Sequence, residues 1–217
     1  MEKDTPLTRK IIIAIIAATA WFALALQLKI SMGTTSQTGF STIKTVTNFF
    51  SYFTILSNLL AGISLTVTLL TPASRVGSFF SKIPVQSAIA VYIFIVGLVY
   101  NLVLRNIWEP EGWQLVADNL LHVVVPVLYV LYWLFFTPKN ILRWTNILPW
   151  LIFPAVYLIY SLIRGLVTSW YPYPFIHAGN LGYGKVTINS LFVLIAIVAV
   201  SVGAIAFNKL TKKISSH

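Results

Sequence analysis

The sequence predicts an all-α polytopic membrane protein with six transmembrane helices and both termini in the cytoplasm. Of its 217 residues, 58% are hydrophobic and only 9% are charged, which is more apolar surface than a soluble domain of this size can bury. A helix needs about 20 apolar residues to cross about 30 Å of hydrocarbon. Six runs have close to that length, at 11–28, 49–70, 85–104, 115–136, 147–166 and 186–207. None alternates as a barrel strand does, so we expect residues 1–217 to form one six-helix domain.

The first run has some features of a signal peptide. Arg9 and Lys10 precede it, and Ala23-Leu24-Ala25 resembles a cleavage site. However, the apolar stretch continues through Leu28 with no polar region before that site. We therefore expect it to be a transmembrane helix that is retained in the protein.

Basic residues predict the orientation of the bundle. Six spans put both chain ends on one side, together with the loops near 71–84 and 137–146. Ten basic residues fall on that side: Lys3, Arg9, Lys10, Arg75, Lys82, Lys139, Arg143, Lys209, Lys212 and Lys213. Five fall on the other side: Lys29, Lys44, Arg105, Arg164 and Lys185. The positive-inside rule then places the termini in the cytoplasm of a multi-pass protein of the cell membrane.

The net charge of +10 therefore reflects topology and contact with anionic membrane lipids, and we expect no nucleic-acid partner. The chain has no cysteine, so it has no disulfide, iron–sulfur cluster or thiolate metal site. We expect no cofactor and no metal ion.

With this orientation, polar residues of four segments reach the same depth in the outer half of the bundle. The second run begins outside, the third ends there, the fourth begins there, and the loop at 168–185 joins the last two runs outside. The polar residues at this depth include Thr54, Ser57, Asn58, Tyr100, Asn101, Arg105, Asp118, Asn119, His122, Tyr171, Tyr173 and His177. An ionisable side chain within a membrane span is a candidate functional residue, because a buried charge is expensive there.

Asp118 and His122 are four residues apart and share one helix face. A carboxylate in that position can orient an imidazole and stabilise its protonated form, as in a hydrolytic triad. The spacing is equally consistent with two polar groups that simply solvate one another.

Thr54 and Asn58 lie one turn apart at the start of the second run. From the local sequence alone, a hydroxyl bonded to the carbonyl of Phe50 is a more common use of Thr54 than nucleophilic catalysis. Asn58 is similarly more typical of helix–helix hydrogen bonding than of an oxyanion donor. Ser57 is rotated away from their line and is the weaker nucleophile candidate.

Proline and aromatic residues mark two further features. Pro126 has no N–H for the carbonyl of His122, which predicts either a widened turn around the histidine or an ordinary kink. The segment Trp170 through Phe175 cannot be a regular span, and it suits either an interfacial aromatic belt or a lid.

At Phe53-Thr54, at Asp118 through His122, and at Trp170 through Phe175, the chain resembles a known family. These are the androgen-induced and androgen-dependent TFPI-regulating membrane proteins and their bacterial relatives. The resemblance extends from the second span to the sixth. It implies a multi-pass threonine hydrolase of fatty acid esters of hydroxy fatty acids, with Thr54 and His122 at the essential positions. Asp118 stands where those proteins have asparagine.

The combined interpretation is a lipid ester hydrolase with Thr54 as nucleophile, His122 as general base and Asp118 as its orienting group. Oxyanion or substrate contacts are expected among Asn58, Asn101, Asn119, Arg105, Tyr173 and His177. A proton-coupled or small-solute transporter or channel would use the same polar cluster, and a non-catalytic scaffold would keep only the fold. Haem ligation by His122 and His177 is a further alternative.

Overall fold

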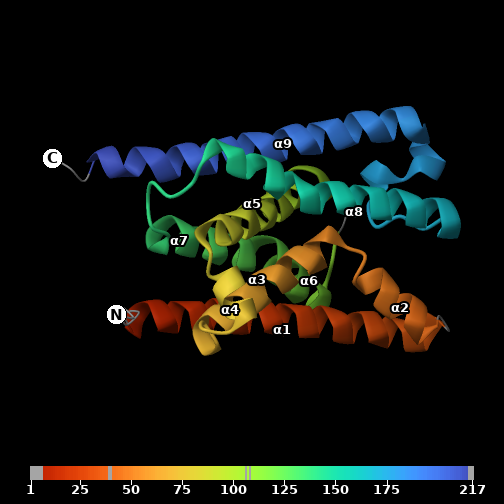
Figure 1. The fold of residues 1–217 in the computed structure, drawn as a ribbon. Helices are drawn as coiled ribbons and strands as arrows, with labels where there is room; N and C mark the ends of the chain where they lie inside the picture. The colour runs from red at the N-terminus through yellow and green to blue at the C-terminus, as the bar shows by residue number, and fades with distance from the viewer. Residues whose placement is uncertain (1–6, 39–40, 106, 108, 215–217) are drawn as a thin grey trace.

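The computed structural model describes residues 7–38, 41–105, 107 and 109–214, and all regular structure in these ranges is helical. Lys3 of the charge count lies outside the described residues, as do the side chains of Lys212 and Lys213. Six helical stretches are long and apolar enough to cross a membrane, as predicted. The start of α1 and the end of α9 lie at the same end of the bundle (Figure 1). Below, this is called the terminal end, and the opposite one the site end.

The spans follow one another with short connections. Their helices are α1 (Leu7–Thr38), α3 (Phe53–Leu70), α5 (Ile83–Val99), α6 (Gly112–Asn119) with α7 (Val125–Phe136), α8 (Ile147–Thr168) and α9 (Ala178–Ile214). Two short helices, α2 (Thr42–Phe49) and α4 (Arg75–Phe80), connect spans at opposite ends of the bundle (Figure 1). π-helical turns extend α5 over Tyr100–Leu104 and join α6 to α7 over Leu120–Val124.

Small residues let α1 and α3 pack closely. Ala20 and Ala23 of α1 and Ala61 of α3 are completely buried. Membrane helices associate through such contacts because lipid supplies no hydrophobic force between them. Trp21 lies over Gly62, which leaves room for the indole ring, and its Nε1 donates to Thr66 Oγ1 at 3.0 Å.

Helix α5 occupies the centre, in contact with α3, α7 and α9. Its side chains from Ile89 to Val96 are buried except for Phe94, as expected of a helix largely surrounded by others. In contrast, α8 and α9 form a pair at one side of the bundle (Figure 1), and many of their apolar side chains are exposed, as lipid-facing residues are.

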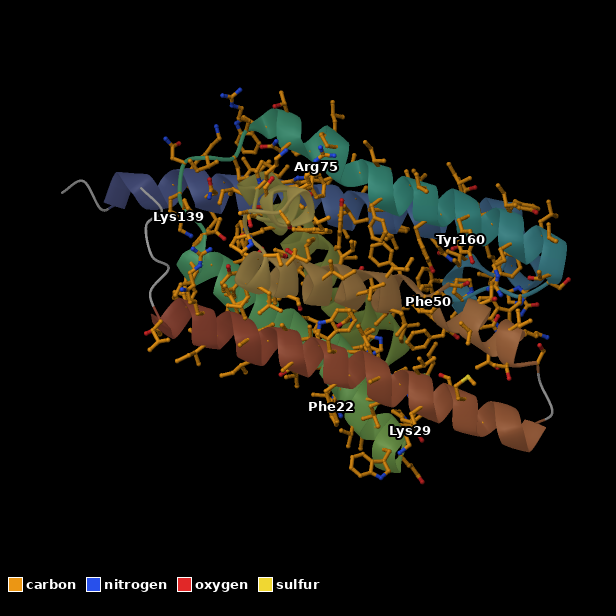
Figure 2. All side chains as sticks on the ribbon, turned by 60° about the horizontal axis from the view of Figure 1, so that its bottom comes forward. Phe22, Lys29, Phe50, Arg75, Lys139 and Tyr160 are labelled. Atoms are coloured by element: carbon orange, nitrogen blue, oxygen red, sulfur yellow. The ribbon has the colours of Figure 1, made fainter. Side chains whose placement is uncertain are left out.

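The second span begins at Phe53 rather than at residue 49, because the chain turns at Phe50–Tyr52 between α2 and α3. Ser51 holds this turn: its Oγ donates to the carbonyl of Thr47 at 2.6 Å and lies 2.7 Å from the hydroxyl of Tyr160. Tyr157 donates to the carbonyl of Ser51 at 2.9 Å. Figure 2 shows Phe50 at this turn and Tyr160 on α8 near it, both in the half away from Lys139. The turn sets the depth and rotation of the first residues of α3.

The connection before the last span is shorter than expected, because α9 begins at Ala178 rather than near residue 186. Gly182 interrupts it with φ 74° and ψ 155°, a conformation that L side chains rarely adopt. The helix therefore consists of a short first piece that leans over the site end, followed by the transmembrane piece.

Candidate active site

Thr54 and His122, predicted from separate spans, lie side by side in the structure. The Oγ1 of Thr54 is 3.3 Å from Nε2 of His122. Thr54 is buried, and the side chain of His122 is 13% exposed. The distance is at the long end of hydrogen bonding, as is common for catalytic pairs without substrate.

The other nitrogen of His122 fixes its tautomer. Nδ1 lies 2.9 Å from the carbonyl oxygen of Asp118 and 3.3 Å from Oδ1 of the same residue. Both are acceptors, so in the neutral imidazole the proton belongs on Nδ1 and Nε2 presents a lone pair to the hydroxyl of Thr54. Asp118 thus lies against His122, and the shorter of the two contacts comes from its main chain.

A π-helical turn sets the rotation of His122. The imidazole lies in the π-helical turn Leu120–Val124, directly before Pro126. Because proline has no N–H, the α-helical hydrogen bond to the carbonyl of His122 is missing, and the turn widens. Asn58 bridges the opening: its Nδ2 donates to the carbonyl of Leu121 at 3.1 Å and to that of Thr54 at 2.9 Å. Asn58 therefore ties the two catalytic candidates together through their main chains.

Two residues of the third span complete the setting of the histidine. The sequence placed Tyr100 at this depth without giving it a role, and it did not point to Gly97. The ring of Tyr100 stacks on the imidazole, with centroids 4.1 Å apart and planes at 15°. Gly97, one turn earlier, allows close approach, since a Cβ there would lie 3.1 Å from the carbonyl oxygen of His122. A glycine one turn before an aromatic residue, near the end of an otherwise apolar span, is the signal that could have found them.

Tyr173 lies directly over Thr54. Its hydroxyl accepts from the main-chain N–H of Thr54 at 3.1 Å and lies 3.2 Å from Oγ1. Thr54 is in the first turn of α3, where N–H groups have no intrahelical partner and the helix dipole is positive. Burial raises the pKa of the Tyr173 phenol to about 12, although its hydrogen bonds with Thr54 act in the opposite direction. The phenol is therefore a neutral donor at ordinary pH.

The aromatic segment Trp170 through Phe175 is folded inward over the site. Tyr52 meets the rings of Trp170 and Tyr173 edge to face, in each case with centroids 5.7 Å apart. The guanidinium of Arg164 lies 4.2 Å from the centre of the Trp170 ring. These contacts hold Tyr173 against Thr54, so the segment is part of the site.

The remaining predicted contacts lie elsewhere. Asn101 donates to the carbonyl of Gly97 and accepts from exposed Arg105, while Asn119 donates to the carbonyl of Leu115. These bonds remain within their own helical segments. His177 packs on Tyr171, and its Nδ1 accepts from the N–H of Asn180 at the start of α9. It lines neither cavity described below and does not face His122 as a second haem ligand would. No cluster of metal-binding side chains occurs among the described residues.

Two cavities meet at the Thr54–His122 pair. The first, here called the apolar cavity, has a volume of about 530 Å³ and extends between α5, α8 and α9. The second, here called the polar cavity, has about 650 Å³ and lies between α1, α2 and α6. Thr54, Tyr100, Leu104, His122 and Tyr173 line both. Both volumes are typical of ligand pockets, which hold roughly 300–1,000 Å³.

Fold and site together define a polytopic helical membrane protein with a buried threonine–histidine pair between two cavities. We compared the chain with protein-family models, curated proteins and solved structures, and none matches it. The resemblance carried by the three short motifs therefore stays a prediction.

Proposed function

We propose that this protein is an intramembrane hydrolase of fatty acyl esters, with Thr54 as nucleophile and His122 as general base. One observation carries the proposal. A buried hydroxyl faces the free nitrogen of a histidine whose tautomer is fixed, at the point where an apolar and a polar cavity meet. This arrangement of nucleophile, base and orienting acceptor is the one that acyl transfer requires.

The reaction begins with transfer of the Thr54 proton to His122 Nε2 as Oγ1 attacks the ester carbonyl. The carboxylate of Asp118, 3.3 Å from Nδ1, stabilises the imidazolium that forms. Collapse of the tetrahedral intermediate breaks the ester C–O bond, and the proton on Nε2 passes to the departing alkoxide. Water, activated by the same nitrogen, then releases the fatty acid from Thr54.

The negative charge of the intermediate develops at the positive end of α3. The hydroxyl of Tyr173 is the donor closest to the reacting oxygen, and the first-turn N–H groups of α3 reinforce it. A single well-placed donor of this kind is worth about 3 kcal/mol of transition-state stabilisation. Asn58 serves the reaction indirectly, because both of its amide hydrogen bonds go to main-chain carbonyls.

The apolar cavity suits the acyl chain. Leu151, Ala155, Leu158 and Leu162 follow one stripe of α8 along its wall. At 1.5 Å per residue this stripe extends for roughly 16 Å, so the cavity is elongated, as an acyl chain is. Leu191 and Leu194 of α9 also line it and are exposed. A ligand can thus enter sideways from lipid.

The basic residues and the motif resemblance complete the proposal. The excess of lysine and arginine on the terminal side orients the bundle with its ends in the cytoplasm. The site then lies in the outer half of the cell membrane. The three motifs favour kinship with the androgen-induced family of threonine hydrolases.

Hydrolysis of long-chain lipid esters by the purified protein tests the proposal. We expect turnover by the wild type, a loss of about 10²–10⁴-fold in kcat for His122→Ala, and no measurable turnover for Thr54→Ala. Thr54→Ser keeps the hydroxyl and should retain activity. Thr19→Ala is the matched control, since Thr19 bonds to the carbonyl of Ile15 on α1 and lines neither cavity.

Thermal melting checks that each variant is folded. Activity that survives in folded Thr54→Ala and His122→Ala would contradict the proposed pair, and absence of wild-type turnover on the whole ester panel would contradict the proposed reaction.

A further inference from the structure

The polar cavity is a second compartment that the acyl chain does not need. It shares the catalytic pair with the apolar cavity but extends in another direction, toward α1, α2 and α6. Thr34 and Ile107, which are exposed, lie at its edge. Cleavage of an ester yields two products, so one of them must occupy the side of the pair that the acyl chain leaves open.

The polar groups that line this compartment are almost all neutral. They are the side-chain amides and hydroxyls of Gln27, Ser31, Thr34, Thr45, Asn48 and Gln114. Gln27 and Gln114 are mutual partners, with Gln114 Nε2 donating to Gln27 Oε1 at 2.9 Å, and so join α1 to α6 across the cavity. No lysine or arginine is among the described residues of the lining. Arg164 stands behind Asn48 and donates to its Oδ1 at 2.6 Å.

Asp118 is the single carboxylate in the lining. The residue is 5% exposed and its Oδ2 is inaccessible to solvent, while the phenol of Tyr100 lies against this carboxylate. Oδ1 is the oxygen that faces His122. Because Asp118 contributes an acceptor to the cavity wall, a ligand hydroxyl beside it would be favoured. A ligand carboxylate or phosphate would instead meet the like charge of Asp118, and Arg164, which donates to Asn48, is not part of the lining.

We propose that the polar cavity binds the alcohol part of the ester, and that this alcohol is a small neutral polyol such as glycerol. The proposal rests on the function proposed above and specifies its substrate class as acylglycerols. In the acylation step the Oγ1–acyl bond forms and the acyl–glyceryl C–O bond breaks. The glyceryl oxygen takes the proton from His122 Nε2 and leaves as neutral glycerol into the polar cavity.

Three palmitoyl esters test this preference: the glycerol monoester, the methyl ester, and the ester of a hydroxy fatty acid that carries a free carboxylate. We expect kcat/KM for the glycerol ester to exceed that for the methyl ester about tenfold, as one hydrogen bond to a charged acceptor would give. The carboxylate-bearing ester is the class that the motif resemblance implies, but it should be the poorest substrate here, because Asp118 stands where the resembling proteins have a neutral asparagine. Equal rates, or a preference for the carboxylate-bearing ester, would overturn the proposal.

Two variants show which cavity sets the preference. Asp118→Asn slows every ester but should shift the ratio of glycerol ester to carboxylate-bearing ester about tenfold toward the latter. Leu194→Trp narrows the apolar cavity and should slow all three palmitoyl esters with their ratios unchanged. A ratio that moves in Leu194→Trp and not in Asp118→Asn would contradict the assignment.

A binding measurement separates this proposal from the proposed reaction. The hexadecyl ether of glycerol cannot be hydrolysed, and it should raise the melting temperature of Thr54→Ala more than hexadecyl methyl ether does. If the glycerol ether stabilises the protein but no ester is cleaved, the proposed hydrolysis is wrong and the proposed binding of a neutral polyol is supported. Conversely, Thr54-dependent hydrolysis with equal effects of both ethers would refute the polyol alone.

Discussion

Two polar side chains, Asn208 and Asp118, are buried at opposite ends of the bundle, and burying either one costs free energy. They differ in how their polar atoms are hydrogen-bonded. At the terminal end, Asn208 is fully buried and its amide is fully used: Oδ1 accepts from the N–H groups of Ile141 and Leu142, both at 3.1 Å, and Nδ2 donates to the carbonyl of Pro138 at 2.9 Å. At the site end, Asp118 is almost as buried and belongs to the wall of a cavity, and its Oδ2 accepts no hydrogen bond from the described residues.

The difference distinguishes a structural polar group from a candidate functional one. The loop after α7 has main-chain N–H and C=O groups without main-chain partners in the described part of the chain. The amide of Asn208 supplies these hydrogen bonds in place of another segment of backbone. Asp118 leaves an acceptor unsatisfied, which natural proteins rarely do without a ligand or a catalytic use. Burial alone does not separate the two, whereas a place in the wall of a cavity does.

The largest expected effect on stability is at Asn208. Asn208→Ala removes three hydrogen bonds and leaves the buried N–H of Leu142 unpaired, so it should lower the free energy of unfolding by about 3 kcal/mol. Asp118→Asn should leave the free energy of unfolding unchanged or raise it, because the substitution removes a buried charge. Denaturation in detergent measures both, with Asn180→Ala, an exposed asparagine, as control. A similar loss of stability in Asp118→Asn would show that Asp118 is also a structural residue and would contradict the distinction.

A smaller effect is expected at Gly165 on α8. A Cβ there would lie within the ring of Tyr171, so Gly165→Ala must displace the aromatic segment that holds Tyr173. Overpacking of this kind costs about 1–3 kcal/mol. Because the segment is part of the site, turnover should fall together with melting temperature. Full activity in a destabilised Gly165→Ala would show that the segment only packs.

Gly97→Ala should affect turnover more than stability. The added methyl lies 3.1 Å from the carbonyl of His122, so the π-helical turn must shift by a few tenths of an ångström. We expect kcat to fall about tenfold, because small displacements of a catalytic group are costly. Gly203→Ala on α9 is the matched control, with nothing within 4 Å of its Cβ. Equal kcat values for the two variants would argue against precise placement of His122.

The smallest expected effect is a loss of stability at alkaline pH that depends on the phenol of Tyr173. Burial raises its pKa from 10.0 to about 12, so between those values the unfolded chain loses this proton and the folded chain keeps it. Stability should therefore fall as pH rises through that window, by on the order of 1 kcal/mol for this residue. Tyr173→Phe should show a shallower fall in alkaline melting experiments. Identical slopes would place the phenol in a more solvated setting.

The sequence was sufficient to predict the six spans, because length and apolar composition dictate them. It misplaced the start of the second, since the turn at Ser51 depends on Tyr157 and Tyr160, which are far away along the chain. Depth and spacing brought Thr54, His122 and Asp118 to one level, and the motif resemblance implied the roles of Thr54 and His122. The sequence could not predict the contacts of Tyr100 and Gly97, because these depend on the widened turn at His122, and a π-helical turn changes which residues share a face.

The exposed wall of the apolar cavity on α9 has a consequence for how the protein meets its ligand. Leu191 and Leu194 are exposed on the outer side of the bundle and also line the cavity. A ligand that enters there never dissolves in water, so the quantity that governs occupancy is its mole fraction among neighbouring lipids. We therefore expect that adding inert detergent or lipid lowers the turnover rate by surface dilution, even at constant bulk concentrations of protein and ligand.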